Sequence, residues 1–463
     1  MLLGYVRAVR QWVVGAWCAL VRALRVFFIG EHATDTELAQ QRPQQPQEEA
    51  TQLPCSKTAA NRALFMAYAA YFACEWLGST DYIQSQTRAS LTETLEDPEL
   101  QQLLADEESG EDGVFDLVWG PACYQAVMSA VADNTMFVCE KRQKGARARQ
   151  TCVLYVSIAG THPLSAFNWF LDLSVVRAVP WPYAQRADCF FSVVQQTAAS
   201  PPATPRRTGE DQSDLRLSSG TLLGLKTLLA LRDPATQQSL VEYLAARAAA
   251  CKERGERLSV VVVGHSLGGA LAGAMALYLH DNVSVWDTHG IARISCVSFA
   301  GPTIGNKLLA RYYDACLGSR TRRIANVYDI VPLAWDSAYM PQMFRVYEPQ
   351  LPTPAPLRMV IQVLINTVGP KHYAHVRDDQ KFFRGTPPQR DHDWVVEVMA
   401  QHSKSYFTHF DMNALAPLIA EHAPLFREPF CDGNFSAASL KTFANMVSDS
   451  VSLAIKRMSG KAE

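Results

Sequence analysis

The sequence lacks the marks of a nucleic-acid-binding or disulfide-rich protein. Its 43 Lys and Arg are offset by 45 Asp and Glu, for a formal net charge of −2, and the central region has no basic cluster, which argues against nucleic-acid binding. The eleven cysteines are an odd number, scattered from Cys18 to Cys431 without a Cys-x-x-Cys pair. This distribution favours free, mostly buried thiols in a reducing compartment over a disulfide framework.

The first thirty residues lack the roughly 20 uncharged positions that a membrane-spanning helix needs. Their longest uncharged run, between Arg10 and Arg22, has eleven residues. On a helical wheel one narrow face is polar (Arg7, Arg10, Gln11, Arg22, Arg25), and large apolar residues take most of the rest (Trp12, Val13, Val14, Trp17, Leu20, Val21, Leu24, Phe27). The pattern predicts that residues 1–30 form an amphipathic helix in a membrane interface.

Two other interpretations of residues 1–30 remain open. The helix would dock on the protein itself, or it would be a cleaved signal peptide, because Arg7 and Arg10 precede an apolar segment. The signal peptide ranks third, since Arg22 and Arg25 follow too soon and no small-x-small cleavage site is clear. We therefore expect an intracellular, peripheral membrane protein rather than a secreted one.

The most informative segment is a β-branched run, Val260 to Val263, that breaks into a glycine-containing turn and then a small-residue helix. The turn comprises Gly264, His265, Ser266, Leu267 and Gly268. This strand–turn–helix order is typical of a nucleophile elbow, whose tight turn requires small flanking residues. Such an elbow exposes the Ser266 hydroxyl and places the Leu267 amide to donate to an oxyanion. The alternative is a Gly/Ser-rich turn without chemistry.

A nucleophilic serine needs an imidazole base, and the imidazole needs a carboxylate that fixes its tautomer. Asp329 lies at the end of an expected strand over 323–329 that stops at Pro332, where an orienting carboxylate belongs. Five histidines compete for the base: His372, His375, His392, His402 and His409. We favour His402, which follows an amphipathic helix beginning near Trp394, with His375 as the alternative.

Four ordered segments between about 150 and 412 resemble the class 3 lipases, the fungal-type family of the α/β-hydrolase fold. They are Val153–Thr161 with Asn168–Leu173, the elbow Gly264–Ala272, Ser298–Asn306, and Asn326–Pro332. The resemblance implies a mostly parallel central sheet with helices on both faces. It also implies Ser266 as nucleophile, Asp329 as orienting carboxylate, His402 as base and the amides of Thr161 and Leu267 as the oxyanion hole, with no metal or cofactor.

The sequence departs from this family at two places. Ala159 stands where the family usually has arginine, which removes a charge beside the oxyanion site without changing its donors. The family's His-x-Gly-Phe block is not recognisable, and Ser219-Gly220-Thr221-Leu222 is its nearest counterpart.

A strongly apolar segment follows the expected oxyanion turn. Phe167, Trp169 and Phe170 lie within a few positions of one another, and a helix carrying them cannot hide every face against one sheet. In the resembling lipases the corresponding helix is a lid that covers the nucleophile in water. The sequence therefore predicts a lid here, with a buried core helix as the alternative.

The composition divides the chain into five parts. After the helix of residues 1–30, a polar Gln/Pro linker occupies 39–57, and 58–134 is expected to be a helical accessory region with apolar residues running from Cys123 to Val131. The hydrolase core is expected over 135–430, with a hairpin at 136–155, a disordered insertion over about 197–218 and a helix over 221–254. A C-terminal helix is expected over 431–463.

The expected function is hydrolysis of glycerolipid acyl esters at a membrane or droplet surface, with lipid and membrane as partners. Two alternatives stay open: a lipase-like scaffold that has lost turnover, and an acyltransferase that uses the same acyl-enzyme. An intact Ser266 and Asp329 count against the scaffold.

Overall fold

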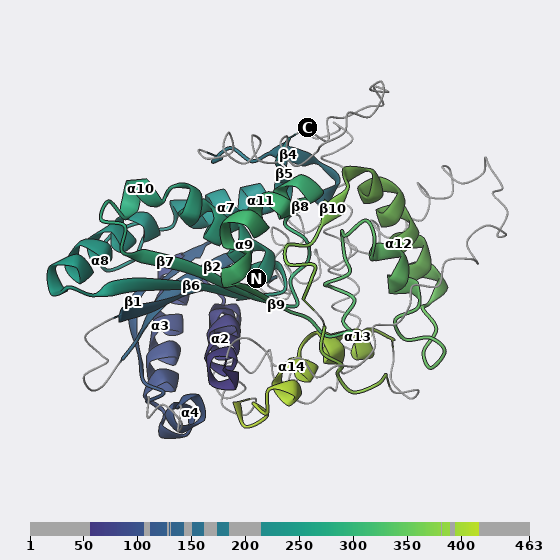
Figure 1. Ribbon diagram of the computed structural model, residues 1–463. Coiled ribbons are helices and arrows are strands. Elements are labelled where there is room, and N and C mark those ends of the chain that lie inside the picture. The colour runs from purple at the N-terminus through teal and green to yellow at the C-terminus, as the bar shows by residue number, and fades with distance from the viewer. Residues whose placement is uncertain are drawn as a thin grey trace.

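The core of the molecule is a six-stranded sheet in the order β1-β2-β3-β6-β7-β9 (Figure 1). The computed structural model describes residues 56–105, 112–126, 129, 131–142, 151–161, 174–184, 214–380, 382–388 and 394–415. The strands are β1 (Phe115–Tyr124), β2 (Asn134–Lys141), β3 (Thr151–Ile158), β6 (Arg257–His265), β7 (Ala292–Phe299) and β9 (Thr321–Ile324). Strands β3, β6, β7 and β9 are mutually parallel, and β1 and β2 extend the sheet antiparallel.

The parallel strands end at one edge of the sheet, which is where ligands bind in open α/β sheets. β6 lies between β3 and β7, with Gly264 level with Ile158 on one side and Ser298 on the other. Its β-branched residues suit a strand covered on both faces. The loops that follow β3, β6, β7 and β9 therefore converge around the end of β6.

Helices cover both faces of the sheet (Figure 1). We call one cover the α9 layer: α7 (Ser219–Ala230), α8 (Leu240–Arg254), α9 (Leu267–Asp281), α10 (Val283–Trp286) and α11 (Lys307–Leu317). The α2 layer covers the opposite face with α2 (Lys57–Ala69), η1 (Ala70–Glu75), α3 (Thr80–Glu96), α4 (Pro98–Leu104) and α14 (Lys404–His409). Each layer packs its own cluster of buried apolar side chains on the sheet.

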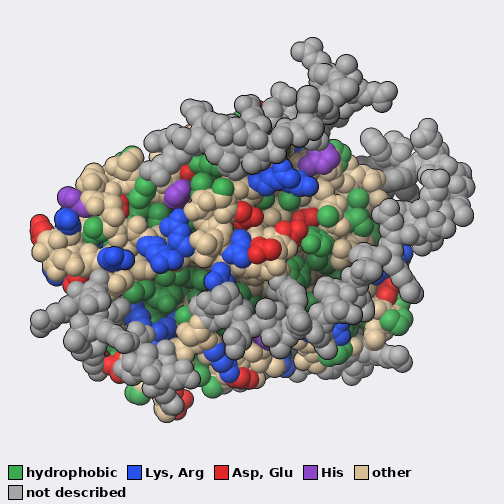
Figure 2. All heavy atoms as spheres, viewed as in Figure 1, with side chains coloured by type: hydrophobic (Ala, Val, Ile, Leu, Met, Phe, Trp, Pro, Cys, Tyr) green, Lys and Arg blue, Asp and Glu red, His purple; other side chains and the backbone are tan. Residues whose placement is uncertain are grey.

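Two further groups of elements lie beside the strand ends. A small sheet in the order β10-β8-β5-β4 joins Tyr373–Ala374, Gly305–Asn306, Arg216–Ser218 and Ala178–Pro180. Short 3-10 turns cover Ser174–Val176, Gly318–Arg320, Met340–Phe344 and Gly369–Lys371, and two more helices are α12 (Ala355–Val368) and α13 (Trp394–His402). Acidic and basic side chains are intermingled over the face shown in Figure 2.

The expected α/β-hydrolase architecture is confirmed, as are the hairpin of β2 with β3 and the helix that begins at Trp394. Four local predictions were wrong. The segment at Cys123 is not helical, because Phe115–Tyr124 is strand β1. The Gly120-Pro121 pair within the strand hid its β pattern in the sequence. β1 is an edge strand, and its pairing with β2 shifts register on either side of Trp119, which allows it to contain a proline.

The other three corrections concern boundaries. The last residues of the insertion expected over about 197–218, Arg216–Ser218, form a strand that pairs with two strands of the small sheet, whereas residues 197–213 lie outside the described residues. The helix expected over 221–254 is two helices, α7 and α8, separated by a turn at Asp233-Pro234, since proline does not continue a helix. β9 ends at Ile324, so Asp329 lies in the turn beyond the strand rather than at its last residue.

Several predictions fall outside the described residues. They are the helix of residues 1–30, nearly all of the linker over 39–57, the lid residues Phe167, Trp169 and Phe170, and the helix over 431–463. Within the described part of the chain, no helix has both the length and the apolar character to cross a bilayer. The seven cysteines described there are free thiols, and six of them are buried.

Candidate active site

Ser266 occupies a strained turn between β6 and α9. Its φ of 59° and ψ of −130° are a backbone conformation that residues other than glycine rarely adopt. The Ser266 amide donates to the carbonyl oxygen of Phe299 at 2.9 Å, which fixes the turn to the end of β7. A Cβ at Gly264 would lie 2.1 Å from the oxygen of Gly268, so only glycine allows the turn to close this tightly.

The turn also packs against the loop that follows β3. A Cβ at Gly268 would lie 2.4 Å from the carbonyl oxygen of Ile158, so the first turn of α9 touches the end of β3. Thr161 follows three residues later. Leu267 is the first residue of α9, where helix amides have no intrahelical partner. The structure thus brings the two predicted oxyanion donors, Thr161 and Leu267, onto adjoining segments beside Ser266.

Asp329 is fully buried and held by three donors. Its carboxylate accepts from the Val331 amide at 3.0 Å, the Tyr406 hydroxyl at 2.9 Å and Nδ1 of His402 at 2.9 Å. Burial raises the pKa of Tyr406 well above its usual value, and the neighbouring Asp329 charge adds to the effect. Tyr406 therefore stays protonated and serves as a donor to the carboxylate.

His402, the last residue of α13, is the histidine that the structure brings to Asp329. Its second contact with the carboxylate, from Nδ1 to Oδ1, is 3.1 Å. A carboxylate only accepts hydrogen bonds, so Nδ1 carries the proton and Nε2 of a neutral ring keeps a lone pair. This is the tautomer that a general base acting on a hydroxyl requires.

The competing histidines lie elsewhere. His375 is buried, and its Nε2 is bonded to the carbonyl oxygen of Pro332. Burial and the nearby Arg323 charge hold the pKa of His375 well below its usual value. His409 stacks on Phe383 with ring centroids 4.0 Å apart, and His372 closes a 3-10 turn at a φ of 52°. His392 lies outside the described residues.

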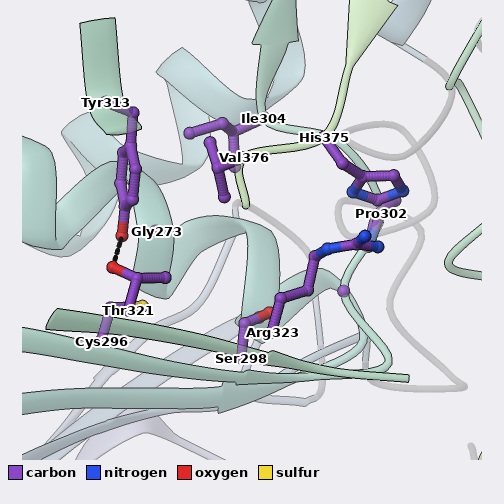
Figure 3. Close-up of a pocket in the computed structure, with 12 residues that line it drawn as sticks. Gly273, Cys296, Ser298, Pro302, Ile304, Tyr313, Thr321, Arg323, His375 and Val376 are labelled. Carbon is purple, nitrogen blue, oxygen red and sulfur yellow. Dashed lines mark hydrogen bonds between the residues drawn. The ribbon is translucent and has the colours of Figure 1, made fainter. Parts of the chain in front are cut away.

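Figure 3 shows His375 beside a small cavity on the α9 side of the sheet. The cavity encloses about 20 Å³ and is lined in part by Gly269, Gly273 and Arg323. That volume admits one water-sized group and no acyl chain. The Arg323 guanidinium faces Asp378 at 3.5 Å and lies 4.8 Å from the centroid of the Phe382 ring, so its charge is already countered. The cavity borders α9 at Gly269 and Gly273, and it is too small to be the binding site of a lipid chain.

Two tyrosines, Tyr406 and Tyr71, lie in contact with this group of residues, and the sequence analysis did not predict either of them. Tyr406 holds Asp329, and its position four residues after His402 is the only signal for it in the sequence. Tyr71 lies far away in the chain, yet its hydroxyl is 3.0 Å from Nδ1 of His265. His265, predicted only as an elbow residue, in turn bonds to the His402 carbonyl.

Comparisons with known proteins show what part of the chain is similar to a known family. The model of the class 3 lipase family matches residues 206–336. Phospholipase A1-II 4 of Oryza sativa subsp. japonica is 36% identical over 81 residues, 18% of this chain and 20% of that protein. The chloroplastic phospholipase A1-Igamma3 of Arabidopsis thaliana is 35% identical over 97 residues, 20% of this chain and 17% of that protein. The chain thus spans at most a fifth of the curated relatives that it matches.

The fold is shared with a solved lipase. The crystal structure of M37 lipase aligns with a TM-score of 0.61 at 24% identity and covers 83% of this chain and 97% of its own. Residues 206–336 include the turn at Ser266, helix α9 and Asp329. The predicted resemblance is therefore confirmed: residues 206–336 match the sequence pattern of the class 3 lipases, and the chain has the α/β-hydrolase fold.

Proposed function

We propose that this protein is a serine hydrolase that cleaves acyl esters of glycerolipids at a membrane or droplet surface. One observation carries the proposal: the buried Asp329 holds the His402 ring, and both lie at the sheet edge where the strained turn presents Ser266. A hydrogen-bonded His–Asp pair beside a serine at φ 59° is the arrangement that nucleophilic catalysis on an ester requires.

The chemistry follows from this placement. Nε2 of His402 takes the proton of the Ser266 hydroxyl as the oxygen attacks the ester carbonyl. The amides of Thr161 and Leu267 stabilise the resulting oxyanion. His402 then gives the proton to the departing alkoxide, which leaves as the alcohol. Water, deprotonated by the same ring, attacks the acyl-enzyme; the bond from the acyl carbon to the Ser266 oxygen breaks, and the ring returns its proton to that oxygen as the fatty acid leaves.

Support for a lipid substrate comes from the relatives, whose names describe lipases and phospholipases A1. Both activities hydrolyse carboxylic esters of glycerolipids with the same kind of triad, and they differ in the class of lipid that is accepted. We therefore expect a panel of triacylglycerol, diacylglycerol and diacyl phospholipid to contain the substrate.

The test is hydrolysis of that panel by the wild type and by Ser266→Ala. We expect fatty acid release by the wild type and loss of at least about 10⁴-fold in the variant. Ser295→Ala, on the neighbouring strand β7, is the matched control and should retain activity. Including an acceptor alcohol separates hydrolysis from acyl transfer. A Ser266→Ala enzyme with more than a tenth of wild-type activity would refute the mechanism.

We further propose that residues 1–30 hold the enzyme on the membrane. Their apolar face offers burial at about 25 cal/mol per Å², and their arginines suit anionic headgroups. Removing residues 1–38 should release the protein from vesicles and slow hydrolysis of bilayer lipid, while hydrolysis of a short soluble ester is spared. Equal loss on both substrates would contradict a role confined to membrane binding.

A further inference from the structure

We propose that Tyr71 of the α2 layer and His265 at the end of β6 are positioning residues. Together they fix the position of the proposed base, His402, relative to the oxyanion loop, which is the segment after β3 that contains Gly160 and Thr161. The inference rests on the proposed ester hydrolase function and deepens it. It assigns an active-site role to an N-terminal segment that precedes the matched lipase region by more than a hundred residues.

The contact begins at η1, which follows directly from α2. Tyr71 is 3% exposed, and its hydroxyl lies 3.0 Å from Nδ1 of His265 and 3.3 Å from the His265 carbonyl oxygen. On the other side of the same ring, Nε2 lies 2.8 Å from the carbonyl oxygen of His402. The His265 ring therefore connects Tyr71 to the backbone of the base.

The direction of these hydrogen bonds is fixed by their partners. A carbonyl oxygen only accepts, so Nε2 of His265 carries the hydrogen, and Nδ1 of the neutral ring accepts from the Tyr71 hydroxyl. Burial, with the neighbouring His402 as a second cause, holds the pKa of His265 well below its usual value. The ring is thus neutral at physiological pH, and it presents one donor and one acceptor to the two groups that need them.

His402 is consequently held at two points. The last carbonyls of a helix lack intrahelical partners, and His402 ends α13, so Nε2 of His265 satisfies a carbonyl that the helix leaves open. Asp329 fixes the ring of the same residue through Nδ1. The hydrogen bond from His265 fixes the backbone position of His402, and the hydrogen bond to Asp329 fixes the orientation of its imidazole ring.

The Tyr71 hydroxyl also packs against the oxyanion loop. A Cβ built at Gly160 would lie 2.0 Å from the Tyr71 oxygen and 2.5 Å from the His265 carbonyl oxygen. Gly160 immediately precedes Thr161, the predicted oxyanion donor. One hydroxyl of the α2 layer is therefore in contact with the loop that carries the oxyanion hole and with the ring that anchors the base.

The experiment compares Tyr71→Phe with Tyr243→Phe. Tyr243 is a buried tyrosine of α8, in the α9 layer, so the control loses the same hydroxyl on the opposite face of the sheet. Both variants keep their rings and are assayed on a soluble ester, with kcat, KM and thermal midpoint measured. Tyr71→Phe should lower kcat about tenfold with KM nearly unchanged, and Tyr243→Phe should leave kcat unchanged.

Two further variants separate positioning from packing. His265→Gln keeps a side-chain donor toward the His402 carbonyl, whereas His265→Leu has none, so glutamine should retain more kcat per folded molecule. In the double variant Tyr71→Phe with His265→Leu, the two losses should be less than additive because both break one chain of contacts. If the losses in kcat are additive, Tyr71 and His265 do not act through one series of contacts.

The outcomes distinguish the inference from the function on which it rests. If the wild type hydrolyses esters through Ser266 and Tyr71→Phe matches Tyr243→Phe in kcat, the positioning role is wrong and the hydrolase stands. A lower midpoint with unchanged kcat would show packing alone and would also overturn the inference. A wild type without ester hydrolysis would overturn both.

Discussion

The two helical layers that cover the sheet relate to the active site in different ways. The α9 layer is joined to it covalently, since Ser266 leads directly into α9. The N-terminal elements of the α2 layer, from α2 to α4, are far away in the chain, and η1 contacts the site through the side chain of Tyr71, which is 194 positions from His265. The comparison teaches that Ser266 is placed by the geometry of one contiguous turn, whereas His402 is placed by contacts with Asp329 and His265, which are distant in the chain.

Both layers are equally well buried, so the contrast is one of function rather than of stability. Leu64 and Phe65 of α2 and Leu225 and Leu228 of α7 are all fully buried. Truncating such side chains costs about 2–5 kcal/mol in either layer. What sets the α2 layer apart is that its polar groups touch His265 and Gly160, while the α9 side contains the small cavity with His375.

The largest expected effect comes from replacing His402, and His375 on the α9 side of the sheet is its matched control. His402→Ala should lower kcat by about 10⁶-fold, because it removes the base itself. His375→Ala, on the α9 side, should leave most of the activity per folded molecule. Steady-state hydrolysis of a soluble ester measures the activity of both variants. A His375→Ala variant that folds but is inactive would show that His375, rather than His402, is the base.

Asp329→Asn should come next, with a loss of about 10⁴-fold in kcat. The amide fills the same space but favours the wrong tautomer of His402. The measurement pairs ester hydrolysis with a thermal midpoint. If instead the variant fails to fold, the buried carboxylate contributes to stability more than to catalysis.

A third prediction compares two glycines, one facing each layer. Gly160→Ala should lower kcat about 100-fold, since its Cβ would collide with the Tyr71 oxygen at 2.0 Å and displace the oxyanion loop. Gly273→Ala on α9 is the control, because its Cβ would meet only Ile304 at an ordinary 3.4 Å. Equal kcat values for the two folded variants would show that the loop tolerates the displacement.

The smallest expected effect is a change in the pH dependence of stability. The folded-state pKa of His265 is lowered, so below about pH 6.5 the unfolded chain binds a proton that the folded chain does not. Stability is therefore complete above that pH and falls as the solution becomes more acidic. His265 faces Tyr71, Tyr68, Tyr406 and His402 across its ring, and none of them supplies a negative charge that would offset this loss.

Replacing the ring tests that sign. His265→Gln should make the fall below pH 6.5 shallower by up to about 1.4 kcal/mol per pH unit. Denaturant unfolding at several pH values measures the slope. An unchanged slope would mean that His265 binds its proton in the folded state as readily as in the unfolded one.

The sequence was sufficient wherever the determinants are local. The elbow is read from one contiguous segment, because Gly264, Ser266 and Gly268 meet steric demands within a single turn. The four ordered segments predicted the family resemblance and the fold for the same reason. The choice of His402 among five histidines depended on a neighbouring helix pattern, and the hydrogen bond to Asp329 is a long-range contact that no spacing specifies.

What the sequence could not reveal depends on tertiary contacts. Strand β1 was missed because Gly120-Pro121 interrupts its pattern, although an edge strand tolerates both residues. β5 is three residues long and is defined only by its partners. Tyr71 lies in an apolar helical pattern that indicates burial, and nothing local in that pattern shows that its hydroxyl meets His265.

The most direct test of the account is the reaction of the full chain with a fluorophosphonate, followed by mass mapping of the adduct. This reagent reports an activated serine without requiring the natural lipid. We expect one adduct per chain, on the peptide that contains Ser266, no adduct in Ser266→Ala and much slower labelling in His402→Ala. Undiminished labelling of Ser266→Ala, or a wild type that does not react at Ser266, would contradict the assignment of this site as a serine hydrolase centre.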